Sequence, residues 1–133
     1  MSLDHFSIVV PAPAFEPLIA FLLKSVGHLG LKEIIRPVPQ VVGLGVTRPY
    51  FWIAISQDDE AAVTTSLKKQ HIAFTAETVE EIKTFYEVAL KEGATDNGAP
   101  GPRNYTPGYY AAFVKDPVAG INFEVCMKTY KGE

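Results

Sequence analysis

The segment formed by residues 109–127 constrains the fold most, because it reads as two apolar strands joined by a turn, with a carboxylate inside the second strand. Aromatic and β-branched residues flank a turn at 116–120 that contains Pro and Gly, which is typical of a β-hairpin. Successive side chains of a strand point to opposite faces, so Glu124 shares a face with Asn122 and Cys126. A carboxylate that faces a sheet interior must be paired, protonated or bound to a cation. We therefore expect another part of the chain to supply its partner.

Composition narrows the class of protein. The chain has 133 residues, 47% of them hydrophobic, which predicts one domain, residues 1–133, with a sizeable core. The net charge of -3 and the lack of a Lys/Arg cluster argue against binding to nucleic acid or to an anionic membrane. The single cysteine, Cys126, excludes an internal disulfide. Neither a membrane span nor a signal peptide is recognisable, and we expect a cytoplasmic protein.

The first part of the chain reads as a strand, a helix and three further strands. Apolar residues alternate over residues 3–10, which places His5 on the same strand face as Ser7. Helical spacing over residues 14–26 ends at Gly27. Three β-like runs separated by Pro and Gly then cover residues 31–38, 41–47 and 50–56. This order predicts a βαβββ module over about residues 1–57.

The same pattern then repeats. After a polar link at 57–70 with a short helix, residues 71–76 form a strand, and Thr78 caps a helix that ends at Gly93. A short strand at 94–97, an irregular loop through Pro107 and the hairpin complete a second module over about residues 70–128. When the two halves are aligned, His5 pairs with His71 and Trp52 pairs with Glu124. Two of the three histidines thus occupy equivalent positions at the starts of the two modules.

This order of elements, from the strand LDHFSIVV through HIAFTA to the hairpin, resembles the vicinal oxygen chelate superfamily, which includes glyoxalase I, the bleomycin-resistance proteins and the extradiol dioxygenases. The resemblance implies an α+β fold in which two βαβββ modules form a curved half-barrel sheet with the helices outside. It also implies one divalent metal ion held by His5, His71 and Glu124. Trp52 stands where glyoxalase I has a fourth ligand, and an indole cannot ligate a metal.

The residue types themselves are compatible with a metal. Two imidazoles and a carboxylate suit Zn²⁺, Fe²⁺, Mn²⁺, Ni²⁺ or Co²⁺ and leave positions for substrate and water, but they do not select among these ions. The alternative is that His5 and His71 are partly buried, hydrogen-bonded side chains and that Glu124 accepts a bond from one or both. The extradiol dioxygenases have a further histidine near the metal, and none here stands in a matching position, so lyase or isomerase chemistry is at least as compatible as ring cleavage.

Several other residues are candidates for the pocket. Tyr109 and Tyr110 lie on opposite strand faces, so one of them should face the cup, where a phenol could bond a metal-bound oxygen or act as acid or base, and the other belongs to the core or rim. Trp52 is a candidate aromatic wall, although plain packing explains it as well. Candidate substrate-binding residues in the irregular loop are Arg103, Asn104 and Tyr105.

The turn 116–120 is one residue longer than the Asp-Pro-x-Gly turn that is common in the superfamily. We expect the extra residue to form a β-bulge that leaves the orientation of Glu124 unchanged.

Three functions stay open. The first is a metal-dependent lyase, isomerase or dioxygenase acting on a small substrate with adjacent oxygens. The second is a metal-free binding protein of the bleomycin-resistance type, and the third is a structural homologue without a site. We also expect a homodimer, because open cups commonly pair in the superfamily and sheet edges need cover. The sequence does not indicate whether the cup closes within one chain or across two.

Overall fold

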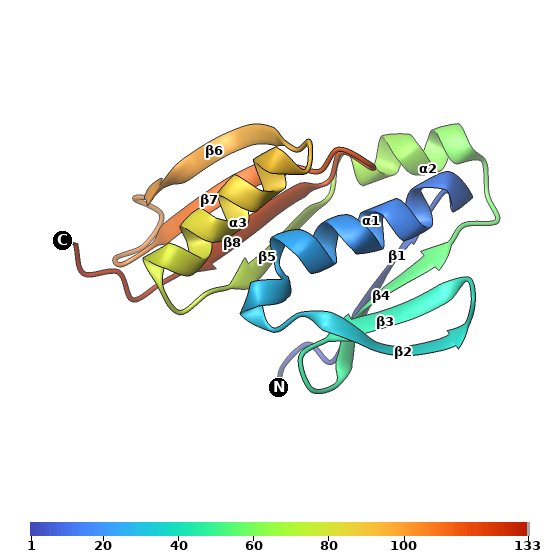
Figure 1. Ribbon diagram of the computed structural model, residues 1–133, viewed down its shortest axis with the longest axis horizontal. Helices are drawn as coiled ribbons and strands as arrows, with labels where there is room; N and C mark the ends of the chain where they lie inside the picture. Colours follow the sequence, from blue (N-terminus) through green and yellow to red (C-terminus); the bar gives the residue numbers. More distant parts are fainter. Residues whose placement is uncertain (133) are drawn as a thin grey trace.

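The computed structural model describes residues 1–132 and shows an α+β chain with two four-stranded sheets (Figure 1). The first sheet has the order β1 (Phe6–Val10), β4 (Pro49–Ile55), β3 (Val41–Gly45), β2 (Lys32–Val38). The second has the order β5 (His71–Thr75), β8 (Asn122–Met127), β7 (Tyr110–Lys115), β6 (Thr95–Pro102). The helices are α1 (Ala12–Ser25), the 3-10 turn η1 (Gly27–Leu29), α2 (Glu60–Leu67) and α3 (Val79–Lys91). The predicted fold of two βαβββ modules is confirmed, and the two sheets do not close into a barrel.

Strand register supports the alignment of the two halves. In each module the first strand pairs in parallel with the last, and the other pairs are antiparallel. Ser7 lies opposite Trp52 in the first sheet, and Ala73, its equivalent, lies opposite Glu124 in the second. Trp52 and Glu124 therefore occupy the same place in their modules, as the sequence alignment predicts.

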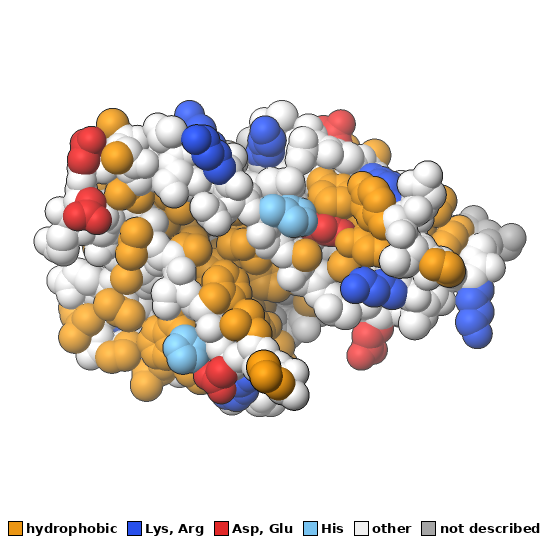
Figure 2. Space-filling view, turned by 180° about the vertical axis from the view of Figure 1, so that it is seen from behind, with side chains coloured by type: hydrophobic (Ala, Val, Ile, Leu, Met, Phe, Trp, Pro, Cys, Tyr) orange, Lys and Arg blue, Asp and Glu red, His pale blue; other side chains and the backbone are white. Residues whose placement is uncertain are grey.

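Helices α1 and α3 lie side by side and cover the same side of the two sheets (Figure 1). The core between helices and strands contains a chain of aromatic rings in which Phe74 of β5 lies 6.1 Å from Phe51 of β4 and 6.2 Å from Phe123 of β8. Phe21 and Phe85, which occupy equivalent positions in the two helices, are both buried there. The opposite side of the sheets has no helix over it and is hollowed, with hydrophobic side chains gathered over the first module (Figure 2).

Local signals fix the ends of the helices. Helix α1 begins at Ala12, two residues earlier than predicted, because proline fits the first helical turn and Pro13 sits there. Thr78 and Glu81 form the capping box of α3, in which each side chain bonds the other's backbone N–H. The polar link contains the expected short helix, α2. Within residues 1–132, none of the helices has the length and apolarity needed to cross a membrane.

Two strand boundaries differ from the prediction by three residues or more, and the others differ by at most two. Strand β1 begins at Phe6, where the sheet pairing with β4 starts, and the backbone oxygen of Asp4 before it accepts a bond from the Arg48 side chain at 2.9 Å. His5 therefore precedes the strand. In the second module, β6 runs through Pro102, where the sequence predicts an irregular loop. It is an edge strand, and register shifts at Gly98 and Gly101 accommodate its glycines and prolines.

The expected bulge in the hairpin is wrong, because β7 and β8 pair without any register shift. The extra residue is absorbed by the turn itself. The buried Asp116 carboxylate accepts backbone N–H bonds from Val118, Ala119 and Ile121 at 2.6 to 2.8 Å. Gly120 adopts a φ of 74°, a conformation that favours glycine. The side chain thus closes a turn that the backbone alone would leave with unpaired donors.

Candidate metal centre

Glu124 lies in the middle of β8 and is only 3% exposed. Its strand neighbours are Ala73 of β5 on one side and Phe113 of β7 on the other. Alternation directs Glu124 to the side of the sheet without helices, together with His71, Ala73 and Thr75 of β5, which are exposed. The methyl group of Ala73 is small, so the carboxylate remains reachable from that side.

The imidazole of His71 pairs with this carboxylate. Its Nε2 lies 2.9 Å from Glu124 Oε1, and its Nδ1 lies 3.2 Å from the backbone oxygen of Asn122. A backbone carbonyl can only accept a hydrogen bond, so Nδ1 carries a proton and Nε2 is the nitrogen turned toward Glu124. Phe113 stacks beside the imidazole with ring centroids 6.0 Å apart. His71 and Glu124, predicted as partners from positions far apart in the sequence, therefore meet.

Of the two candidate tyrosines, Tyr109 contacts the site. Its hydroxyl donates a short hydrogen bond to Glu124 Oε2. Burial, and then the bond to Glu124, raises the pKa of the Tyr109 phenol above its ordinary value, so the phenol stays a hydrogen-bond donor at neutral pH. Tyr110 is 5% exposed and packs against Tyr130 in the core, with ring centroids 4.8 Å apart.

His5 lies apart from this pair, at the start of the first module. Its Nδ1 is 2.6 Å from Asp4 Oδ1, and Arg48 holds Asp4 through the backbone oxygen at 2.9 Å. The hydrogen bond with His5 lowers the pKa of Asp4. Residues 1–132 contain no group of three or more His, Cys, Asp or Glu side chains placed to hold one metal ion. One chain therefore brings together His71 and Glu124, but not His5.

The remaining candidates have mostly structural contacts. Trp52 is half-buried and its ring covers Gly43, where an added Cβ would lie 3.0 Å from the indole. Arg103 donates to the backbone oxygens of Ala99 and Gly101, both at 2.8 Å, and lies over the ring of Phe113. Asn104 is exposed. Tyr105 is also exposed and meets Tyr109 edge to face at 5.1 Å.

Two contacts of the histidines were not predicted from the sequence. Asp4 orients His5, and the signal was its position next to that histidine. Phe113 stacks on His71, and the signal was strand alternation, which places Phe113 on the same face as Glu124.

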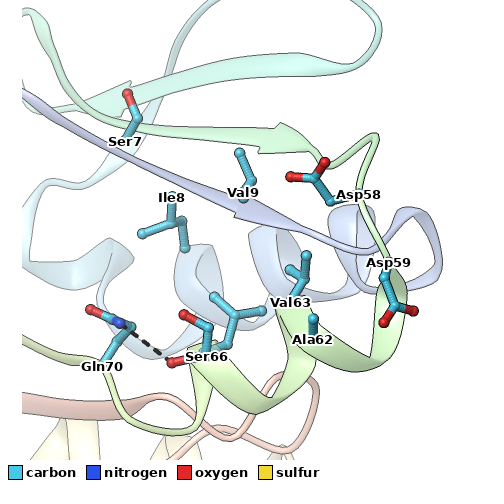
Figure 3. Close-up of a pocket in the computed structure, with 10 residues that line it drawn as sticks. Ser7, Ile8, Val9, Asp58, Asp59, Ala62, Val63, Ser66 and Gln70 are labelled. Atoms are coloured by element: carbon cyan, nitrogen blue, oxygen red, sulfur yellow. Dashed lines mark hydrogen bonds between the residues drawn. The ribbon is translucent and has the colours of Figure 1, made fainter.

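Three cavities lie near these residues. One, of about 570 Å³, is bordered by Tyr109 and Cys126 and adjoins Glu124 through the Tyr109 hydroxyl. A second, of about 350 Å³, lies between β1 and β5 and is lined by His71 together with Ser7. The third, of about 660 Å³, lies between β1 and α2, with Asp58 and Asp59 where β4 leads into α2, and neither His71 nor Glu124 lines it (Figure 3). The first two cavities therefore adjoin the candidate centre.

Comparison with known families agrees with this architecture. The model of the Glyoxalase/Bleomycin resistance protein/Dioxygenase superfamily matches residues 3–125. The chain belongs to this superfamily. No curated protein sequence matches it significantly.

Solved structures of superfamily proteins share the fold. A glyoxalase/bleomycin resistance protein/dioxygenase family enzyme from Burkholderia phytofirmans PsJN is 23% identical, with a TM-score of 0.69, over 96% of this chain and 99% of that one. A glyoxalase-related enzyme from Fulvimarina pelagi is 11% identical, with a TM-score of 0.66, over 96% of this chain and 88% of that one. A point mutant of the fosfomycin resistance protein FosX from Listeria monocytogenes, complexed with Mn(II) and 1S,2S-dihydroxypropylphosphonic acid, is 18% identical, with a TM-score of 0.62, over 98% and 90% of the two chains.

Proposed function

We propose that the protein is a divalent-metal-dependent enzyme that acts on a small substrate with adjacent oxygens. We assign His71 and Glu124 of one chain and His5 of a second copy as the protein ligands. The observation that carries the proposal is the contact between His71 Nε2 and Glu124 Oε1 at 2.9 Å, in which an exposed imidazole meets a buried carboxylate in a superfamily fold. The Mn(II) complex of the structurally similar FosX supports a divalent ion in such a fold.

The donor set fits a divalent ion. In metal sites, the ring nitrogen of histidine that does not bind the metal usually donates to an oxygen, which fixes the ring. Both histidines have such an oxygen at Nδ1, the backbone oxygen of Asn122 for His71 and Asp4 Oδ1 for His5. Each ring therefore has Nε2 left for an ion, and Glu124 supplies an anionic oxygen. Two imidazoles and one carboxylate suit zinc, iron, manganese, nickel or cobalt.

A second copy of the chain explains why one chain lacks the third ligand. In a two-fold symmetric dimer, any residue that reaches across to a site is matched by its counterpart reaching the other way. His5 of each chain can then complete the His71–Glu124 pair of the other, which gives two equivalent sites.

The surface of the first module suits such a contact. Among the described residues, all large hydrophobic side chains that are more than 40% exposed lie in this module except Tyr105, and they are Met1, Leu3, Val9, Ile35, Val38 and Val46. Figure 2 shows hydrophobic side chains spread over this part of the uncovered face. Where such side chains form a contiguous patch, the patch marks a site of contact with another protein or a ligand. Strand β1, which follows His5, is also a sheet edge.

The side chains around the pair suggest how a substrate would be handled. Tyr109 donates its hydroxyl hydrogen to Glu124 Oε2 and keeps its proton at neutral pH, so it orients the carboxylate. Phe113 limits the movement of the His71 ring. A bound divalent ion would act as a Lewis acid toward the substrate oxygens.

Metal analysis tests the proposal. Protein purified without chelator and then titrated with Zn²⁺, Mn²⁺ and Fe²⁺ should bind one ion per chain, and Glu124→Ala should lower the affinity by at least about 10 to 100-fold. Thr75→Ala, on the same sheet face but outside the ligand set, is the matched control and should bind as the wild type does. If wild type and Glu124→Ala bind equally, or neither binds, the metal proposal fails and a metal-free binding protein becomes the better account.

A further inference from the structure

The cavity of about 570 Å³ next to Tyr109 contains a charged group that the ligand set does not use. Lys128 lines this cavity together with Thr75 and Thr129, and Tyr109 borders it from the side of Glu124. The Lys128 ammonium lies 6.0 Å from the centre of the Tyr109 ring. Within the described residues, Lys128 takes part in none of the ion pairs.

The opposite charge in the cavity comes from Glu77, which precedes α3. Its backbone N–H bonds Glu81, and Glu77 is not paired with Lys128. One ammonium and one carboxylate leave the cavity without net charge. Glu77 opposes and Lys128 favours the binding of any anion, and the single positive charge of Lys128 matches the single negative charge of a carboxylate.

We propose that this cavity holds a carboxylate group of the substrate, bound by the Lys128 ammonium with hydroxyl donors from Thr75 and Thr129. The substrate is then a small carboxylic acid whose adjacent oxygens lie at the His71–Glu124 end and whose carboxylate lies at the Lys128 end. This assignment of the substrate class rests on the proposed function.

The chain between the two ends limits the length of such a substrate. Lys128 follows β8 directly, and four residues at about 3.3 Å each put an upper limit of roughly 13 Å on the distance between the Cα atoms of Glu124 and Lys128. Tyr109 connects the two ends, because its hydroxyl donates to Glu124 and its ring centre lies 6.0 Å from the Lys128 ammonium. A small substrate that contacts Tyr109 can therefore reach both.

The other cations near the site fit this role less well. Two backbone oxygens accept bonds from Arg103, which also covers Phe113. Lys115 lies on the same sheet face, beside Asn122, but is not among the residues that line the cavity. Lys115→Gln is therefore a control that removes one positive charge from this face and leaves the cavity intact.

The test uses two probes with the same oxygen-bearing end: 3,4-dihydroxyphenylacetate, which has a carboxylate, and 4-methylcatechol, which has none. Mn²⁺ affinity is first measured for the wild type, Lys128→Gln, Lys115→Gln and Glu77→Gln. Both probes are then titrated anaerobically by calorimetry into each Mn²⁺-loaded protein.

The wild type should bind the carboxylate probe about tenfold more tightly than the neutral one, as expected for a hydrogen bond to a charged group. Lys128→Gln should abolish this preference without changing the affinity for Mn²⁺ or for 4-methylcatechol.

The controls separate the possible outcomes. Lys115→Gln should keep the preference for the carboxylate probe. Glu77→Gln should increase this preference, because it removes a negative charge that repels the carboxylate. The proposal is overturned if Lys128→Gln keeps the preference, or if Lys115→Gln loses it equally.

If the wild type binds no metal, the proposed function has failed. The same probes are then titrated into the metal-free protein while NMR follows the Thr75 and Lys128 signals. A carboxylate preference that depends on Lys128 then still supports the anion site, and its absence overturns it.

Discussion

The imidazole of His71 lies between two oxygens: Nε2 is 2.9 Å from Glu124 Oε1, while Nδ1 faces the backbone oxygen of Asn122. The contact between Nε2 and the carboxylate joins the two side chains that the proposed metal ion needs, so an ion bound by both must take the place of this contact.

The first prediction follows from this contact. A metal ion binds the deprotonated forms of its ligands, so binding between the two side chains should be coupled to the release of a measurable number of protons per site. Calorimetric titrations with Mn²⁺ in buffers of different ionisation enthalpy measure this number. Binding without proton release would show that the ion does not replace the His71–Glu124 contact.

The second prediction concerns Tyr109. Tyr109→Phe removes the donor to Glu124 Oε2 and should weaken metal binding by about tenfold, as loss of an outer partner of a ligand does. Tyr110→Phe, in the core one residue away, is the matched control and should leave metal affinity unchanged. Equal effects of both substitutions on metal affinity would assign the loss to packing instead of the hydrogen bond.

The third prediction concerns the turn before β8. Asp116→Ala leaves three backbone N–H groups without their acceptor and should lower the free energy of unfolding by about 3 kcal/mol or more. Asp116→Asn keeps an amide oxygen for part of this set and should lose less. Urea denaturation measures both values, and equal losses for the two variants would contradict the role given to the carboxylate oxygens.

The fourth prediction is a pH dependence at Cys126, which is 8% exposed. Burial is the main cause that raises the pKa of this thiol above its ordinary value, with a further contribution from the nearby Glu124 carboxylate. Because only the thiolate reacts, alkylation in the folded protein should be slow at neutral pH and should still be accelerating as pH rises through 9.0, the ordinary value. Denatured protein is the control and should react faster at every pH. A folded-state rate that levels off near pH 8 would contradict the raised pKa.

The sequence predicted the modules well because their signals are local and are repeated. Thr78 with Glu81 marks a helix start, and alternation along residues 71–75 fixes which face is exposed. The pairing of His71 with Glu124 was also accessible, since equivalence of the two modules places both on one sheet face.

What the sequence could not supply depends on distant contacts. Asp116 closes the hairpin turn through bonds that compete with a bulge, and no periodicity distinguishes these two solutions. Strand β1 begins only after His5, and the Asp4 oxygen before it is bonded by Arg48, far along the chain. Spacing along the sequence likewise does not show that His5 lies apart from His71 and Glu124 in one chain.

The proposed sharing of the metal site between two chains can be measured with mixed dimers. His5→Ala and Glu124→Ala chains with different tags are co-expressed, and the heterodimer is purified through both tags. If His5 reaches across, one site of the heterodimer loses two ligands and the other keeps all three. About one Mn²⁺ should then bind per heterodimer, while neither variant homodimer should bind Mn²⁺ tightly. Recovery of this single tight site is the result that the shared centre predicts. A heterodimer that binds no Mn²⁺ tightly, or a chain that is monomeric and binds one Mn²⁺ through its own His5, would contradict it.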